Sequence, residues 1–278
     1  MGQSDEQWRT QRQAERDNIV AMQDAGVNQI ISSPENYAAY LEVQGANPMY
    51  SAGNIALAMV QFPGISQIGT AERWKVLGRT VLDSEKSNGI QIFARGSFGK
   101  GYGIANAYDI TQTFGREVST VKVAEGSKEM EGALTTVMNY SLVPIEIDHD
   151  LPEPAYYDHN KLVIAANPNF GEAETFAALA TEVALSRIHN KGKNIHYTRK
   201  ENELDAQSVS YLLCKRFGIE CEMPDLSILT DIYNGWTAPE IRQALSYIQD
   251  MSKQIGGSID KSITPQPHSR GNMRRPAR

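Results

Sequence analysis

The sequence predicts an α+β protein with a small α+β first half and a mainly helical second half. Two kinds of pattern support this class. Short apolar runs bounded by turn residues, at residues 90–93 and 103–108, are typical of strands. Longer segments with helical periodicity, at residues 176–189 and 201–217, dominate the later part of the chain. No internal repeat is found, and 278 residues are compatible with two ordinary domains plus tails.

Glycine, proline and N-capping residues divide the first half into elements. Residues 1–30 are polar, and their apolar side chains are too sparse for a core, which predicts a mobile helix. The elements expected after it are helices at 35–45 and 54–60, a short helix at 74–77, strands at 90–93 and 103–108 joined by the glycine-rich loop 95–101, and a short strand at 118–123. These elements predict a mobile segment at 1–32 and a first domain at 33–125.

The second half is expected to form one mainly helical domain at 126–255. Its predicted elements are a helix at 127–140, strands at 143–147 and 161–165, two long helices at 176–189 and 201–217, and further helical segments at 224–233 and 239–254. The second long helix ends at Gly218, a residue that commonly terminates helices. From residue 256 to 278, Gly, Ser, Pro and Arg predominate, which predicts a disordered basic tail.

Composition excludes several classes of protein. No apolar run approaches 18 residues, so we expect no membrane span. The polar start has no apolar segment typical of a signal peptide, so we expect a cytoplasmic location. The two cysteines, Cys214 and Cys221, cannot form a disulfide framework, and their spacing fits no zinc pattern.

Charge is distributed unevenly around a net value of −6. Residues 70–102 carry 6 basic and 3 acidic side chains, whereas residues 103–260 carry 13 basic and 23 acidic ones. The last 18 residues carry 5 basic side chains and no acidic one. The local excess of positive charge at 70–102 and in the tail is therefore compatible with a nucleic-acid partner, although the whole chain is acidic.

The stretch from Thr181 to Leu185 has the glutamate of a zinc-peptidase helix without its histidines. In His-Glu-x-x-His, two histidines one helical turn apart bind Zn²⁺, and the glutamate between them activates a water molecule. Here Thr181 and Leu185 occupy the two histidine positions, and Glu182 is the remaining acid. Threonine is a poor zinc ligand and leucine is none. Glu182 is therefore predicted to be a vestigial general base, with no zinc and no other cofactor.

The chain resembles ArdC-type antirestriction proteins and the related LtrC-like proteins over residues from about 33 to 250. In that family, His-Glu-Leu-Ala-His is followed by Glu-Ala-Glu and Val-Ala-Tyr. This sequence has Thr-Glu-Val-Ala-Leu, then Asp-Ala-Gln at 205–207 and Val-Ser-Tyr at 209–211. The first half is similar in order and spacing to the family's DNA-binding domain, at Tyr50, Ser51, Asn54, Gln61, 73–75, 78–79, 84–86, 89–90, 108–110 and 112–113.

The resemblance implies a single-stranded DNA-binding domain followed by a zincin-like domain, here a pseudo-peptidase, in a protein of a plasmid or conjugative element. Its implied partners are single-stranded DNA and restriction or DNA-processing proteins. Single strands are bound by aromatic rings that stack on bases and by cations that contact phosphates. The candidate DNA-binding residues are Tyr50, Asn54, Arg73, Trp74, Lys75, Arg79, Lys86, Arg95, Phe98, Lys100 and Tyr102.

Structural roles stay open for several of these residues. Trp74 and Phe93 could be core residues, and Tyr50 and Asn54, four apart on one helix face, could serve structural hydrogen bonds. In the second half, Glu182 could bond to Thr181, Arg187 or a backbone group. His189 lies about 10.5 Å along a helix from Glu182, too far for both to bind one zinc ion.

Three hypotheses of function follow. The first is a non-catalytic, antirestriction-like protein that binds single-stranded DNA. The second is an active metalloprotease with a displaced site built from His189, His196 and either Glu203 or Asp205. The third is a scaffold that binds protein partners through its acidic second half. Binding of oligonucleotides, stoichiometric zinc, or the absence of both would distinguish them.

Overall fold

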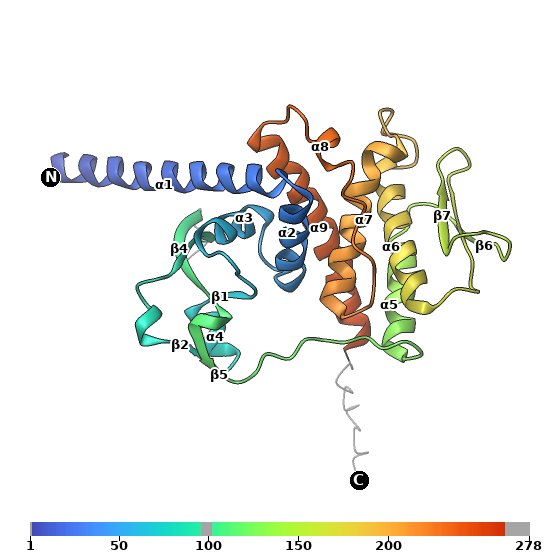
Figure 1. Ribbon diagram of the computed structural model, residues 1–278, viewed down its shortest axis with the longest axis horizontal. Coiled ribbons are helices and arrows are strands. Elements are labelled where there is room, and N and C mark those ends of the chain that lie inside the picture. The colour runs from blue at the N-terminus through green and yellow to red at the C-terminus, as the bar shows by residue number, and fades with distance from the viewer. Residues whose placement is uncertain (1, 96–101, 265–278) are drawn as a thin grey trace, which may run out of the picture.

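A computed structural model describes residues 2–95 and 102–264 of the chain and confirms the α+β class. Three helices open it: α1 (Gly2–Ile30), α2 (Pro34–Ala46) and α3 (Ala52–Gln61). The side chains of Ser33 and Ser51 accept hydrogen bonds from the backbone N–H groups three residues later, as N-caps do. Local capping thus explains where α2 and α3 begin. Figure 1 shows α1 extending well beyond the body of the molecule.

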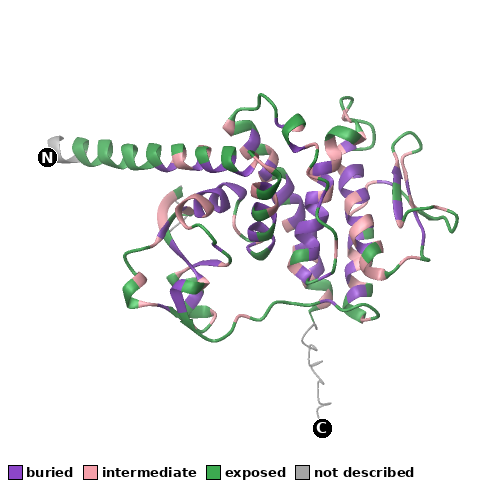
Figure 2. Cartoon of the chain, in the orientation of Figure 1, coloured by how far each residue is buried: buried purple, intermediate pink, exposed green. Residues whose placement is uncertain are grey.

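The later part of α1 belongs to the core, contrary to the expectation that residues 1–30 lack enough apolar side chains. Ile19, Val27 and Ile30 are buried, where α1 packs against α3 and against the last long helix. Gly26 permits the close approach, because a Cβ there would lie 2.7 Å from the carbonyl oxygen of Ala56. The few apolar residues of α1 are enough to bury one of its faces, because α3 and the last long helix supply the apolar surfaces against which that face packs. Figure 2 shows the change along α1, from an exposed outer half to a partly buried inner half.

An antiparallel sheet of three strands follows, in the order β1-β4-β3. Its strands are β1 (Ile68–Thr70), β3 (Ile90–Arg95) and β4 (Tyr102–Asp109). A second, two-stranded sheet pairs β2 (Arg79–Val81) with β5 (Thr113–Gly115). Along the chain, these strands are connected by the short helical segments α4 (Ala71–Val76), η1 (Asp83–Glu85) and η3 (Ile110–Gln112). The two longer strands confirm the predicted hairpin. Ile90, Ile92 and Ala107 are buried on one face, while Phe93 pairs with Ile104, and Arg95 with Tyr102, on the opposite face.

The free edge of β3 is covered by two amide side chains of α3. Asn54 accepts from the backbone N–H of Phe93 at 2.9 Å and donates to its carbonyl oxygen at 2.8 Å. Gln61 forms the same pair of bonds with Gln91, both at 2.9 Å. Each amide satisfies one strand residue as a neighbouring strand would, so the edge is protected from pairing with another chain. Asn54 is therefore a structural residue and not the DNA-binding residue that the sequence suggested.

Replacing Asn54 with Ala should lower the free energy of unfolding by about 1–3 kcal/mol, because it leaves the N–H and C=O groups of Phe93 unpaired in a partly buried place. Gln61→Ala is the matched control. Its bonds to Gln91 are exposed, and water can replace them, so its loss should be smaller. Urea unfolding of both variants measures the difference, and equal losses would contradict this account of the edge.

The second half places a small sheet beside long helices. Its elements are α5 (Lys128–Asn139), β6 (Ile145–Ile147), β7 (Ala155–Asp158), β8 (Val163–Ala166), α6 (Glu172–His189), α7 (Arg199–Phe217), α8 (Leu229–Ile232) and α9 (Ala238–Ile263). The strand order is β6-β8-β7, with β6 parallel and β7 antiparallel to β8. Helices α6 and α7 pack side by side, and α9 lies against α5 and α7 (Figure 1).

Three expectations for the part of the chain after residue 117 are wrong. No strand forms at 118–123, where Val123 makes a single backbone bond to the carbonyl of Phe217. Of the helix expected at 224–233, only α8 (Leu229–Ile232) forms. The tail does not begin at Gly256, because α9 continues to Ile263, and Gly256 makes room for Arg216, whose Nη1 would lie 2.7 Å from an added Cβ. The remaining basic tail residues lie outside the described ranges.

One hydrophobic core runs through both halves of the chain. It includes Tyr37 and Leu41 of α2 together with Leu213 of α7 and Leu245 of α9. The hydroxyl groups of Tyr37 and Ser208 are 3.0 Å apart and buried, which adds a polar link between α2 and α7. None of the helices in the described ranges combines the length and hydropathy that crossing a bilayer requires.

Candidate functional site

Glu182 is buried on α6, and both of its carboxylate oxygens accept hydrogen bonds from protein groups. Oε1 accepts from Nη2 of Arg199 at 2.7 Å, and Oε2 accepts from Nη1 of the same guanidinium at 2.9 Å. Oε2 also accepts from the backbone N–H of Tyr157 at 2.8 Å. Burial raises the pKa of Glu182, while Arg199 and the Tyr157 amide oppose the shift. The ion pair with Arg199 stabilises the charged form of Glu182, which makes its carboxylate a weaker base than burial alone would make it.

Arg199 is the first residue of α7 and is held on three sides. Besides its two bonds to Glu182, its Nη2 lies 3.4 Å from a carboxylate oxygen of Glu203, and its guanidinium carbon is 4.9 Å from the centre of the Tyr156 ring. Bidentate pairing of this kind fixes both partners in one geometry. We call the pair of Glu182 and Arg199 the clamp.

The sequence did not predict the clamp. The backbone partner of Glu182 is Tyr157, while Thr181 bonds to the carbonyl of Ala177 and Arg187 to the carbonyl of Tyr140. Arg199 did carry one usable signal. A cation in the first turn of a helix is disfavoured by the helix dipole, so its presence there indicates an acidic partner.

The two positions that would hold zinc-binding histidines fit a metal ion poorly. Leu185 is fully buried and has no donor atom, and the hydroxyl of Thr181 is used within α6. The neighbouring Glu182 is already paired with a permanent cation, which would repel a metal ion. The residues present at this place therefore do not fit a zinc site.

The displaced metal site that the sequence left open is not assembled either. Nδ1 of His189 lies 2.7 Å from the Tyr157 hydroxyl, its ring stacks on Tyr197 at 4.5 Å, and burial lowers its pKa. Glu203 faces Arg199, whereas His196 and Asp205 line a separate pocket beside Trp236. Over the ranges that the structure describes, no group of three His, Cys, Asp or Glu residues could hold a metal ion.

In the first half, two predicted DNA-binding residues turn inward. Trp74 is buried, and its Nε1 donates to the carbonyl of Tyr108 at 2.9 Å, so the ring cannot stack on a base. Arg79 donates from Nε to the hydroxyl of Thr113 at 2.7 Å, and from its terminal nitrogens to the carbonyls of Thr113 and Arg116 at 2.9 and 2.7 Å. It joins β2 to the segment around β5. Both assignments are corrected to structural roles.

Other predicted residues remain accessible. The exposed cations are Arg73, Lys75, Lys86 and Arg95, and Lys86 forms an exposed ion pair with Asp83. Tyr102 exposes 59% of its surface at the start of β4, and Phe93 is half-buried beside it in the sheet. Phe98 and Lys100 lie outside the described residues.

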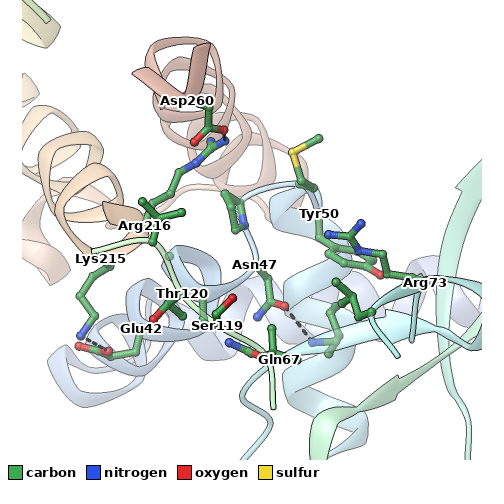
Figure 3. Close-up of a pocket in the computed structure, with 18 of the residues that line it drawn as sticks. Glu42, Asn47, Tyr50, Gln67, Arg73, Ser119, Thr120, Lys215, Arg216 and Asp260 are labelled. Carbon is green, nitrogen blue, oxygen red and sulfur yellow. Dashed lines mark hydrogen bonds and ion pairs between the residues drawn. The ribbon is translucent and has the colours of Figure 1, made fainter. Parts of the chain in front are cut away.

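A cleft of about 830 Å³ lies between the two halves of the chain. Figure 3 shows Tyr50 and Arg73 on one side of it, and Arg216 with Asp260 on the other. Lys215 is paired with Glu42, and Arg216 with Asp260, so two of the three cations lining the cleft are already neutralised. Tyr50 is half-buried, and burial raises its pKa. The cleft therefore presents little net charge to a ligand.

Three solved chains match this structure. Two of them are crystal structures of the antirestriction protein ArdC from the R388 plasmid, one metal-free and one Mn(II)-bound. Each has a TM-score of 0.52 and 16% sequence identity, over 87% of this chain and 97% of the ArdC chain. The sequence resemblance is thus confirmed at the level of the fold. No protein-family model matches the sequence, and no match is found among curated proteins.

Proposed function

Taking the ArdC-like fold as the premise, we propose that this protein binds single-stranded DNA and acts as an antirestriction-like protein of a plasmid or conjugative element. The observation that carries the proposal is the likeness to ArdC along nearly the whole of both chains, because both halves of the fold are then present in the same order. The proposed location is the cytoplasm. The proposed partners are single-stranded DNA and restriction or DNA-processing proteins.

The exposed residues of the first half support the DNA-binding part of the proposal. Tyr102 and Arg95 occupy paired positions at one end of the hairpin, so an aromatic ring and a cation lie next to each other. This combination suits unpaired bases and phosphates better than a duplex, whose bases are already stacked.

The second half is proposed to be catalytically inactive. Its clamp holds Glu182 in a bidentate pair, and the histidine positions of the zinc motif carry Thr181 and Leu185. The zincin-like part would then support the fold and present an acidic surface to protein partners, without hydrolysing peptides.

The test combines DNA titrations with elemental analysis of the purified protein. We expect tighter binding to a labelled single strand than to a duplex of the same sequence, with binding that weakens as salt is raised. We expect less than stoichiometric zinc or manganese. One metal ion per chain together with peptidase activity would favour the metalloprotease. If neither DNA form binds at low salt and no metal is present, the scaffold hypothesis replaces this proposal.

A further inference from the structure

A groove of about 730 Å³ lies between the outer half of α1 and the hairpin of β3 and β4. Its sheet wall includes Phe93, Tyr102 and Asn106, and its helix wall includes Trp8 and three arginines. Between residues 6 and 18, every residue of α1 is exposed, so this stretch is not needed to close the core. Figure 1 shows it projecting past the sheet. The packing of the protein alone does not account for this extension.

The three arginines lie on one face of the helix. Arg9, Arg12 and Arg16 are spaced by three and four residues, which places them in one row along α1. They are all the basic residues that the first 69 residues contain. Among the side chains that the structure describes, none of the three forms an ion pair. The one acidic residue in the groove lining is Glu15, so the helix wall carries a net positive charge.

Exposed aromatic rings face the groove from both walls. Trp8 exposes 58% of its surface, and the guanidinium of Arg12 lies 4.8 Å from the centre of its ring. Tyr102 exposes 59% on the opposite wall. Two exposed rings on facing walls of one groove can each stack on a flat base. The mixture of rings, arginines and amide side chains matches a chain of phosphates carrying flat, unpaired bases.

We propose that this groove is a binding site for single-stranded DNA, with the arginine row of α1 contacting phosphates and with Trp8 and Tyr102 stacking on bases. The inference rests on the proposed function. The sequence already indicated Tyr102 as a DNA-binding residue, but it indicated no contact in α1. The groove adds α1 to the binding surface, so the strand is held between a helix and a sheet. The net positive charge of the lining favours an anionic partner over a neutral peptide. The exposed rings of Trp8 and Tyr102 favour a partner with flat bases over an acidic peptide.

The test uses the full-length protein and a labelled oligo(dT) of about 20 nucleotides, which is longer than one binding module usually covers. The triple variant Arg9→Ala, Arg12→Ala, Arg16→Ala should bind more weakly. The slope of log K against log salt concentration should become shallower by up to about 2, at about 0.7 per lost phosphate contact. Because these side chains are exposed, thermal unfolding should be unchanged. The matched control removes three exposed lysines elsewhere, Lys122, Lys128 and Lys193, and should bind as the wild type does.

Stacking is tested separately. Trp8→Ala and Tyr102→Ala should each weaken binding about 5- to 150-fold if the ring stacks on one base. If the wild type binds and the arginine variant binds equally well, the groove is overturned while the proposed function stands. If the ring variants bind as the wild type does, the stacking is overturned. If the wild type itself binds no single strand at low salt, the proposed function fails, and this inference fails with it.

Discussion

Replacing Arg199 with Met should lower the free energy of unfolding by about 3–5 kcal/mol, because it leaves the carboxylate of Glu182 buried without its cation. The remaining hydrogen bond from the Tyr157 amide cannot neutralise the charge. Burial already raises the pKa of Glu182, and removing the arginine removes the main group opposing that shift. The variant should therefore regain part of its stability as the pH falls and Glu182 is protonated. Urea unfolding at several pH values measures both effects.

Two further variants separate the clamp from its surroundings. Glu203→Gln removes the other acidic partner of Arg199, at 3.4 Å and more exposed to solvent, and should cost at most about 1 kcal/mol. The double variant Glu182→Gln, Arg199→Met should recover most of the lost stability, because a neutral amide oxygen can still accept from the Tyr157 N–H. If the double variant is as unstable as Arg199→Met alone, the unpaired charge is not the cause of the loss.

Raising the pH from 5 to 8 should destabilise the wild type relative to Asp205→Asn by about 2–3 kcal/mol. Burial raises the pKa of Asp205 to about 7. An unfolded aspartate titrates near a pKa of about 3.9, so the folded protein binds this proton more tightly. The resulting stabilisation is fully present below the unfolded pKa and is lost as the pH rises through about 7. The free energy of unfolding of both proteins, measured across this range, gives the difference.

Asp225→Asn is the matched control for this pH dependence. Asp225 is exposed, and hydrogen bonds with Ser227 lower its pKa, so its titration belongs to more acidic conditions. Its stability should follow the wild type between pH 5 and 8. If the free energy of unfolding of Asp205→Asn also changes with pH as that of the wild type does, then the pKa of Asp205 is not raised in the folded protein.

The sequence determined the local elements because their signals lie within a few residues. Ser33, Ser51 and Thr198 begin helices by bonding to N–H groups three residues later, and Gly218 ends α7 with a left-handed backbone. The alternating apolar residues of the hairpin select its buried face. The absence of histidine at both Thr181 and Leu185, on either side of Glu182, is likewise visible without a structure. The α+β class and the order of most elements follow from these signals.

Only the tertiary structure decided which side chains are used inside the protein. Arg199 reaches Glu182 across 17 residues, and Asn54 reaches Phe93 across 39, so no local pattern reveals either pair. Trp74 and Arg79 are residue types common on DNA-binding surfaces, but their N–H groups donate hydrogen bonds to residues of β4 and β5 within the protein. Conversely, the arginines of α1 gain a facing wall only because the chain folds back as the hairpin. The burial of a side chain and its bonding partner depend on segments that are distant in the sequence, whereas helix capping and hydrophobic periodicity depend on residues within one segment.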